Sequence, residues 1–224
     1  MAELMLCALM AFSVGEKLTY KVKYGPLTAA TLTLEVMGTD KVGGESCYHL
    51  VSHLVSNPTY SHLFFFDDIM ESWCRTSDFV TLRVHKDSRG AKSHTDVTTD
   101  FDYATNTASY SDSTQCHIHP DSRDMLSLWY YFRVVGMEMG DTLNLWSHWD
   151  KKNYSVSASA DDQQHVSTPA GEFDCLVIDM NSSSPAAVGT VYLSNDEESL
   201  PVIIRTRLPL GYVTLSLTGR DANE

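Results

Sequence analysis

The residues best suited to chemistry occur together in the run Cys116–Arg133, which contains five candidate catalytic side chains. These candidates are His117, His119, Tyr130, Tyr131 and Arg133. A histidine can remove a proton as a general base, and a tyrosine can donate one as a general acid. An arginine can neutralise a carboxylate such as that of a uronate sugar. The run therefore allows a polysaccharide-active enzyme, a lyase or a hydrolase, as one interpretation.

Each of these side chains also has a purely structural interpretation. His117 and His119 are two residues apart, so on a strand they would share a face and could share a metal ion with Asp121 or Asp124. The other histidines form no companion motif such as His-Glu-x-x-His, and the sequence predicts neither a metal nor a cofactor. The tyrosines could simply pack against a sheet while Arg133 pairs with an acid such as Asp124.

A second set of residues could bind a ligand without transforming it. His49 and His53 have the even spacing that places two side chains on one face of a strand, and Trp146 and His148 have it too. Trp73 and Trp146 offer flat apolar surface that suits a sugar ring or an acyl chain. Packing in the core or at a sheet edge is the alternative for all of them.

Two acidic clusters, Asp67-Asp68 with Glu71 and Asp196-Glu197-Glu198, could supply the paired carboxylates of a glycosidase. Such carboxylates stand about 5 to 9 Å apart across the substrate. Both clusters are expected beside turns, where solvated acids are common. The chain contains no G-x-S-x-G elbow, no P-loop and no G-x-G-x-x-G fingerprint, which argues against the commonest hydrolase, NTPase and dinucleotide-binding folds.

Strands are expected to position most of these residues, because the dominant hydrophobic period is two. Lys17–Tyr24 alternates strictly, Gly25-Pro26 then turns the chain, and Leu32, Leu34 and Val36 continue the alternation, which predicts a hairpin. The further strands predicted are Ser46–Ser56, Tyr60–Phe66, Glu71–Arg75, Phe79–His85, weaker ones between Ser93 and Tyr110, Asp141–Trp149, Asn153–Ala160, Glu172–Met180, Thr190–Leu193, Val202–Leu208 and Tyr212–Thr218. The short turns between them predict antiparallel pairing.

One segment, Asp121–Gly136, has helical spacing instead. Its apolar stripe comprises Met125, Leu128, Trp129, Phe132 and Val135. Asp121 or Ser122 is the expected N-cap, and Gly136 is the expected end. A solitary helix among many strands must lie against a concave sheet, which predicts a mainly β (α+β) fold: a long curved antiparallel sheet, a half-barrel or open barrel, with one helix on the concave side.

Length and composition predict one β-rich domain over residues 14–220, preceded by a tail or remnant of an export segment over residues 1–13. The formal net charge of −13 argues against a nucleic-acid partner. No segment approaches the roughly 18 apolar residues of a membrane span. Five scattered cysteines leave isolated thiols or one disulfide open, and the sequence does not predict the oligomeric state.

Several segments resemble a bacterial family of exported proteins known as domain of unknown function 3108. Gly15-Glu16-Lys17-Leu18-Thr19-Tyr20 resembles its G-E-x-L-x-Y start, and the segment from Asp124 to Arg133 resembles its D-x-L-S-x-x-Y-x-x-R helix. Further matches follow in order at Gly140–Leu143, Thr168–Leu176, Leu193–Glu197 and Leu200–Val202. His117-Ile118-His119-Pro120 departs from the family pattern. The resemblance implies a cell-envelope protein with an extended sheet curled around a helix, similar to half-barrels that carry lipoproteins or lipids.

The sequence thus leads to two functional hypotheses. The first is a periplasmic or secreted protein that holds a small amphipathic or glycan ligand in the concavity of its sheet, with His49, His53, Trp73, Trp146 and His148 as ligand contacts. The second is the polysaccharide-active enzyme described above. A filled concavity without a pocket would favour a structural role over both.

Overall fold

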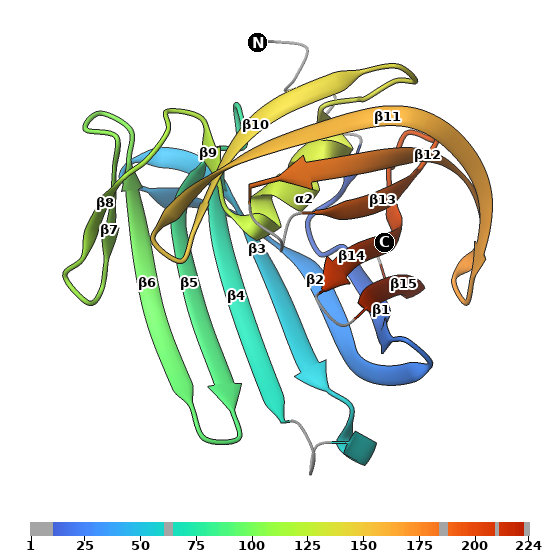
Figure 1. Cartoon of the computed structure of the whole chain (residues 1–224). Coiled ribbons are helices and arrows are strands. Elements are labelled where there is room, and N and C mark those ends of the chain that lie inside the picture. Colours follow the sequence, from blue (N-terminus) through green and yellow to red (C-terminus); the bar gives the residue numbers. More distant parts are fainter. Residues whose placement is uncertain (1–10, 61–64, 184–187, 209–210, 222–224) are drawn as a thin grey trace.

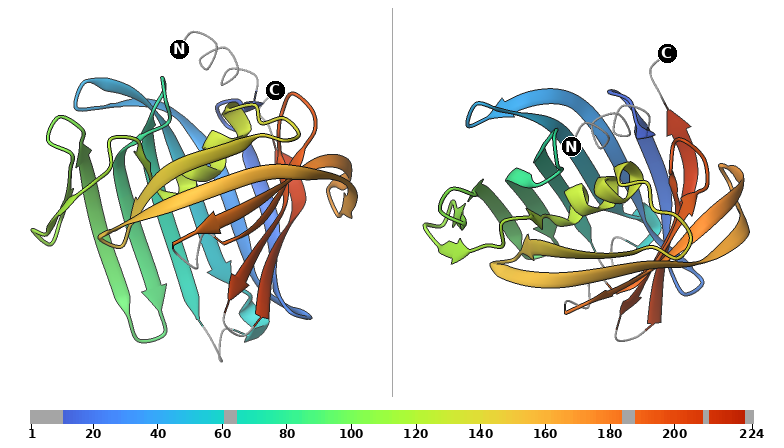
Figure 2. Two further views of the ribbon diagram at one scale, coloured as in Figure 1. Left: turned by 45° about the horizontal axis from the view of Figure 1, so that its top comes forward. Right: turned by 90° about the horizontal axis from the view of Figure 1, so that it is seen from above.

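The computed structural model describes residues 11–60, 65–183, 188–208 and 211–221. Within these residues fifteen strands form one strongly curved, open sheet, and helix α2 (Met125–Val134) lies inside the curve (Figures 1 and 2). A short 3₁₀ helix, η1 (Pro58–Tyr60), lies outside the sheet. The strands are β1 (Lys17–Tyr24), β2 (Leu27–Val42), β3 (Glu45–Ser56), β4 (Phe66–Arg75), β5 (Thr81–Gly90), β6 (His94–Asp102), β7 (Thr107–Tyr110), β8 (Gln115–His117), β9 (Ser122–Arg123), β10 (Thr142–Trp149), β11 (Lys152–Thr168), β12 (Gly171–Ser182), β13 (Gly189–Ser194), β14 (Pro201–Leu208) and β15 (Gly211–Asp221).

The strand order places the middle of the chain at the two edges of the sheet. From edge to edge it runs β8-β7-β6-β5-β4-β3-β2-β1-β15-β14-β13-β12-β11-β10-β9. Neighbours pair antiparallel except β9 and β10, which are parallel. The edge strands β8 and β9 are consecutive in the sequence and are joined by residues 118–121. The sheet therefore curls until its edges face each other, without closing through backbone hydrogen bonds.

The predicted strand pattern is confirmed in its main features. β1 pairs with β2 as the expected hairpin, and Leu18, Tyr20 and Val22 are buried while the intervening lysines are more exposed. The predicted strand Tyr60–Phe66 is wrong at both ends, since Tyr60 belongs to η1 and Phe66 begins β4; residues 61–64 lie outside the described residues. Asp67, Asp68 and Glu71, which were expected beside turns, lie within β4.

Helix α2 is shorter than expected and is buried on more than one stripe. Asp124, not Asp121 or Ser122, is its N-cap, because Ser122 and Arg123 pair with β10 as β9. Leu126, Leu128, Tyr130, Phe132 and Val134 are all buried. The helix lies between the two arms of the curved sheet (Figure 2). None of its residues is exposed.

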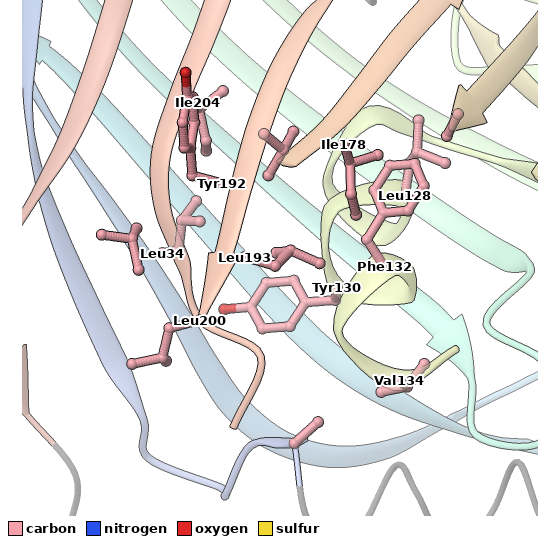
Figure 3. Packing of buried hydrophobic residues seen from close by; sticks show 14 of the residues in the cluster. Leu34, Leu128, Tyr130, Phe132, Val134, Ile178, Tyr192, Leu193, Leu200 and Ile204 are labelled. Carbon is pink, nitrogen blue, oxygen red and sulfur yellow. The ribbon is translucent and has the colours of Figure 1, made fainter. Parts of the chain in front are cut away.

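The hydrophobic core fills the space between this helix and the inner face of the sheet. Phe132 points from α2 toward Ile178 of β12, and Tyr130 lies beside Leu193 of β13 (Figure 3). Ala11 and Phe12, which the sequence placed in the tail, are also buried in this core. Cys47, Cys74, Cys116 and Cys175 are free thiols, and Cys7 lies outside the described residues. None of the helices described is long and apolar enough to cross a bilayer.

Candidate functional site: the concave face

Two adjoining cavities lie in the concavity where the core does not fill it. The larger, of about 640 Å³ and called here the seam cavity, is lined by apolar side chains of β4, β5, β6, α2 and β10, such as Met70, Val97, Phe101 and Trp149. The smaller, of about 220 Å³ and called here the helix cavity, is bounded by residues such as Leu54, Trp129, Ile204 and Leu215. Met70, Lys86 and Met125 line both, so the two cavities adjoin at the start of α2.

The strands present these side chains to the concavity by simple alternation. Ser72 points inward, since its hydroxyl donates to Asp124 on the helix at 2.5 Å, and Met70 and Asp68 occupy the same face at two-residue steps. On β5 and β6 the corresponding inward residues include Val84, Lys86, Val97 and Phe101. Apolar walls with a few polar groups are typical of a binding site for a small, partly apolar molecule.

Asp124 fixes the helix between the strands at the point where the cavities adjoin. One carboxylate oxygen accepts from the Leu126 and Ser127 amides at 2.7 and 3.1 Å, which caps α2. The other accepts from the hydroxyls of Ser72 on β4 and Thr81 on β5 at 2.5 and 2.6 Å. All four bonds are buried, so this carboxylate is structurally saturated and has no free lone pair to offer to a ligand.

Side chains, not backbone pairing, connect the two edges of the sheet. This connection, called here the seam, consists of Tyr110, His148, Lys151 and Asn153. The Tyr110 hydroxyl accepts from the Lys151 amide at 2.9 Å and lies 2.8 Å from His148 Nε2. The Asn153 amide donates to the His117 carbonyl at 2.8 Å, and its Oδ1 lies 2.8 Å from His148 Nδ1. Nδ1 of His148 therefore donates, and Nε2 accepts from the tyrosine.

His148 is held neutral by this arrangement. Its side chain is 1% exposed, and burial lowers the pKa of the imidazole. Burial raises the pKa of its partner Tyr110 to about 12, so the phenol keeps its proton. Lys151 also contacts the Asp112 carboxylate and donates to Thr114 at 3.0 Å, so the mouth of the seam cavity carries paired charges.

The structure separates the predicted catalytic residues into different environments. His119 stacks on Trp146 with ring centroids 4.0 Å apart, and His117 is exposed at the end of β8. Tyr131 lies under the Arg123 guanidinium, 3.7 Å from its ring centroid. Among the described residues, no hydrogen bond, ion pair or ring contact joins either histidine to Tyr130, Tyr131 or Arg133.

Arg133 pairs with Glu16 and not with Asp124, which the sequence had suggested. Its Nη1 donates to Glu16 Oε1 at 2.5 Å, and both side chains are at most 1% exposed. The hydroxyls of the buried Tyr20 and Tyr130 lie without hydrogen-bond partners in the same region. Burial raises the pKa of both phenols. The two family-like segments of the sequence thus meet inside the core, where Arg133 is already neutralised and covered.

His49, His53 and Trp73 lie on the convex face. His49 stacks on Trp73 at 4.4 Å, and Trp73 Nε1 donates to Asp40. His53 Nε2 lies 2.6 Å from Asp67 Oδ1. On the same face His85 contacts Glu71 and Asp96, and these carboxylates raise its pKa. None of the described groups of histidine, cysteine and acidic residues has an arrangement that could hold a metal ion.

Of the ligand-contact residues chosen from the sequence, His148 lines the seam cavity. The side chains that form most of the cavity walls were not chosen, because valine, methionine and leucine at alternate strand positions look identical whether they pack a core or line a cavity. Met125 and Trp129 were recognised only as part of the helix stripe. Asp68 gave no signal either, because the sequence placed it beside a turn and not on a strand that faces the concavity.

The fold and the sequence each match known proteins. The crystal structure of a β-barrel-like protein of domain of unknown function DUF1849 from Brucella abortus superposes with a TM-score of 0.64 at 7% identity, covering 94% of this chain and 98% of that one. A DUF1089 family protein from Pseudomonas aeruginosa superposes with a TM-score of 0.51 at 11% identity, covering 80% of this chain and 92% of that one. No curated protein matches significantly. The model of a protein family of unknown function, DUF3108, matches residues 19–218.

Proposed function

The chain belongs to the DUF3108 family, and from that premise we propose that it is a binding protein of the bacterial cell envelope that holds an amphipathic ligand in the concavity of its sheet. The observation that carries the proposal is the pair of adjoining cavities under the seam, of about 640 and 220 Å³. Their walls are mainly apolar, and both are partly open to solvent, as the entry of a ligand requires.

The residues around the cavities support binding more than catalysis. Asp124 is saturated, Lys151 is paired with Asp112, and His148 is committed to Tyr110 and Asn153. Arg133 is neutralised by Glu16 away from the cavity walls. Among the described residues, none of the predicted catalytic side chains lines either cavity: His117, His119, Tyr130, Tyr131 and Arg133 are all absent from the walls.

Binding of the uncharged fluorescent probe N-phenyl-1-naphthylamine tests the proposal. We expect a saturable increase of probe fluorescence, with quenching or a spectral shift of Trp129 and Trp149, which line the helix cavity and the seam cavity. Val97→Trp fills part of the seam cavity and should weaken binding by about tenfold, or ~1.4 kcal/mol. Thr98→Trp alters the next residue of β6, which faces the convex side, and should leave the affinity within about twofold.

Circular dichroism establishes that each variant is folded, and Thr95→Trp at the cavity rim replaces Val97→Trp if the latter does not fold. A wild-type protein that shows no saturable binding would refute the proposal. Equal weakening by Val97→Trp and Thr98→Trp would also refute it, because the probe would then bind outside the concavity.

A further inference from the structure

Three polar side chains lie together on the wall where the two cavities adjoin. Asp68 on β4 is directly opposite Ser88 on β5, and Met70 is directly opposite Lys86. Residues two apart on a strand share a face, so Asp68 and Ser88 point to the same side as Met70 and Lys86, which line both cavities. All of Asp68, Ser88 and Lys86 line the helix cavity.

The hydrogen bonding of this polar set is incomplete. The Asp68 carboxylate has no hydrogen bond or ion pair among the described residues. The Ser88 hydroxyl oxygen is buried and also lacks a partner. Lys86 has only a loose contact with Asp150, at 3.7 Å. Asp68 is half-buried and Lys86 is exposed, so water can reach both of them, but buried polar groups are normally hydrogen-bonded. The buried Ser88 hydroxyl beside these two charged groups therefore indicates a partner supplied by a ligand.

The charges of the set restrict which polar group can bind there. A carboxylate or phosphate near Lys86 would also lie near the Asp68 carboxylate, and an ammonium near Asp68 would lie near Lys86. A hydroxyl group avoids both conflicts, since it donates to a carboxylate and accepts from an ammonium at the same time. Two adjacent hydroxyls would satisfy Asp68, Lys86 and Ser88 together.

We propose that the ligand is an uncharged amphiphile with a polyol head, of the glycerol or sugar type, whose adjacent hydroxyls bind Asp68, Ser88 and Lys86 while its apolar chain occupies the neighbouring cavity. This assignment rests on the proposed function, because it names the class of molecule that the concavity holds. In this arrangement the apolar chain of the ligand lies against side chains of the seam cavity such as Met70, Val97 and Phe101.

A series of decyl amphiphiles that differ only in the head group tests the assignment. Displacement of N-phenyl-1-naphthylamine is measured at pH 7.5 below the critical micelle concentration for 1-decanoylglycerol, decyl glucoside, decanoate and decyltrimethylammonium. The Kd values of 1-decanoylglycerol and decyl glucoside should be about tenfold lower than those of decanoate and decyltrimethylammonium.

Variants of the polar set locate the head group. Asp68→Asn should strengthen decanoate binding and Ser88→Ala should weaken binding of the polyols, each by about threefold to fivefold. Asp67→Asn is the matched control: the neighbouring carboxylate faces the convex side beside His53, and its removal should change no affinity. Two outcomes would overturn the head-group assignment but leave the cavity proposal standing, provided that the wild type binds the probe. In the first, decanoate binds as tightly as the two polyols. In the second, Asp67→Asn and Asp68→Asn have equal effects on affinity. Absence of probe binding by the wild type would instead overturn the cavity proposal.

Discussion

Glu16 and Arg133 form an ion pair that is almost completely removed from water. Besides the Glu16 carboxylate, Arg133 donates to the carbonyl oxygens of Ala11 and Glu198. The guanidinium thus connects the segment before β1, the last turn of α2 and the turn between β13 and β14. Desolvation makes such a pair expensive to form, but an unpaired partner left in the core is more expensive still.

Removing the charge of Glu16 should therefore destabilise the fold strongly. Glu16→Gln is expected to lower the free energy of unfolding by about 3 kcal/mol, because it leaves the Arg133 charge buried and unpaired. Urea unfolding followed by tryptophan fluorescence measures the loss. Glu35→Gln removes the half-exposed partner of Lys17 and should cost less than about 1 kcal/mol. Similar losses for the two variants would contradict the role assigned to the buried pair.

At the scale of elements, Asp124 determines where α2 begins and how it is held. Asp124→Ala would leave two helix amides and the hydroxyls of Ser72 and Thr81 without their acceptor. We expect a loss of about 3 kcal/mol in the free energy of unfolding, combining a lost cap with buried unsatisfied groups.

Asp121→Ala is the control for this prediction. Asp121 is exposed and its carboxylate makes no hydrogen bond in the described residues, so its removal should change stability by less than about 0.5 kcal/mol. The same urea titration distinguishes the two variants. A larger loss for Asp121→Ala would mean that the helix is capped from the position that the sequence suggested.

Most elements were predictable because each one carries its own periodic signal. The alternation of Leu18, Tyr20 and Val22 marks β1, and the spacing of Met125, Leu128 and Phe132 marks α2, without reference to the rest of the chain. The cap was predicted at the wrong residue because Ser122 and Arg123 pair with β10, and this contact is distant in sequence. The cavity walls could not be predicted for the same reason, since Val97 on β6 and Trp149 on β10 come together only when the whole sheet curls.

At the scale of the whole molecule, the seam is the weakest connection in the sheet, because side chains replace a backbone ladder there. Neutral His148 accepts a hydrogen bond from the Tyr110 hydroxyl, and burial holds the pKa of the imidazole below its ordinary value. A histidine with a lowered folded-state pKa stabilises the closed seam above its unfolded pKa of about 6.5. This contribution is lost progressively as the pH falls through that value toward the folded-state pKa.

Hydrogen exchange should detect this loss. Between pH 7.5 and pH 5, after correction for intrinsic rates, the amides of the β7–β8 hairpin and of the β10–β11 turn should lose protection, whereas those of β1 and β2 should not. His148→Gln cannot titrate and should remove the pH dependence. Protection at the seam that stays constant in the wild type would show that His148 does not control it.

The pairing of β1 with β15 has a consequence for how the protein is made. The first and the last strands of the sheet are neighbours at its centre. During synthesis the two halves of the sheet, β1–β8 and β9–β15, therefore emerge one after the other, and the ladder between β1 and β15 can form only after β15 has emerged. In the nascent chain, the edge of β1 that will pair with β15 must therefore stay unpaired until synthesis of the domain ends. A circular permutant with its ends joined and a new opening at residues 118–121 would present the same strands in their spatial order and would acquire the central ladder early.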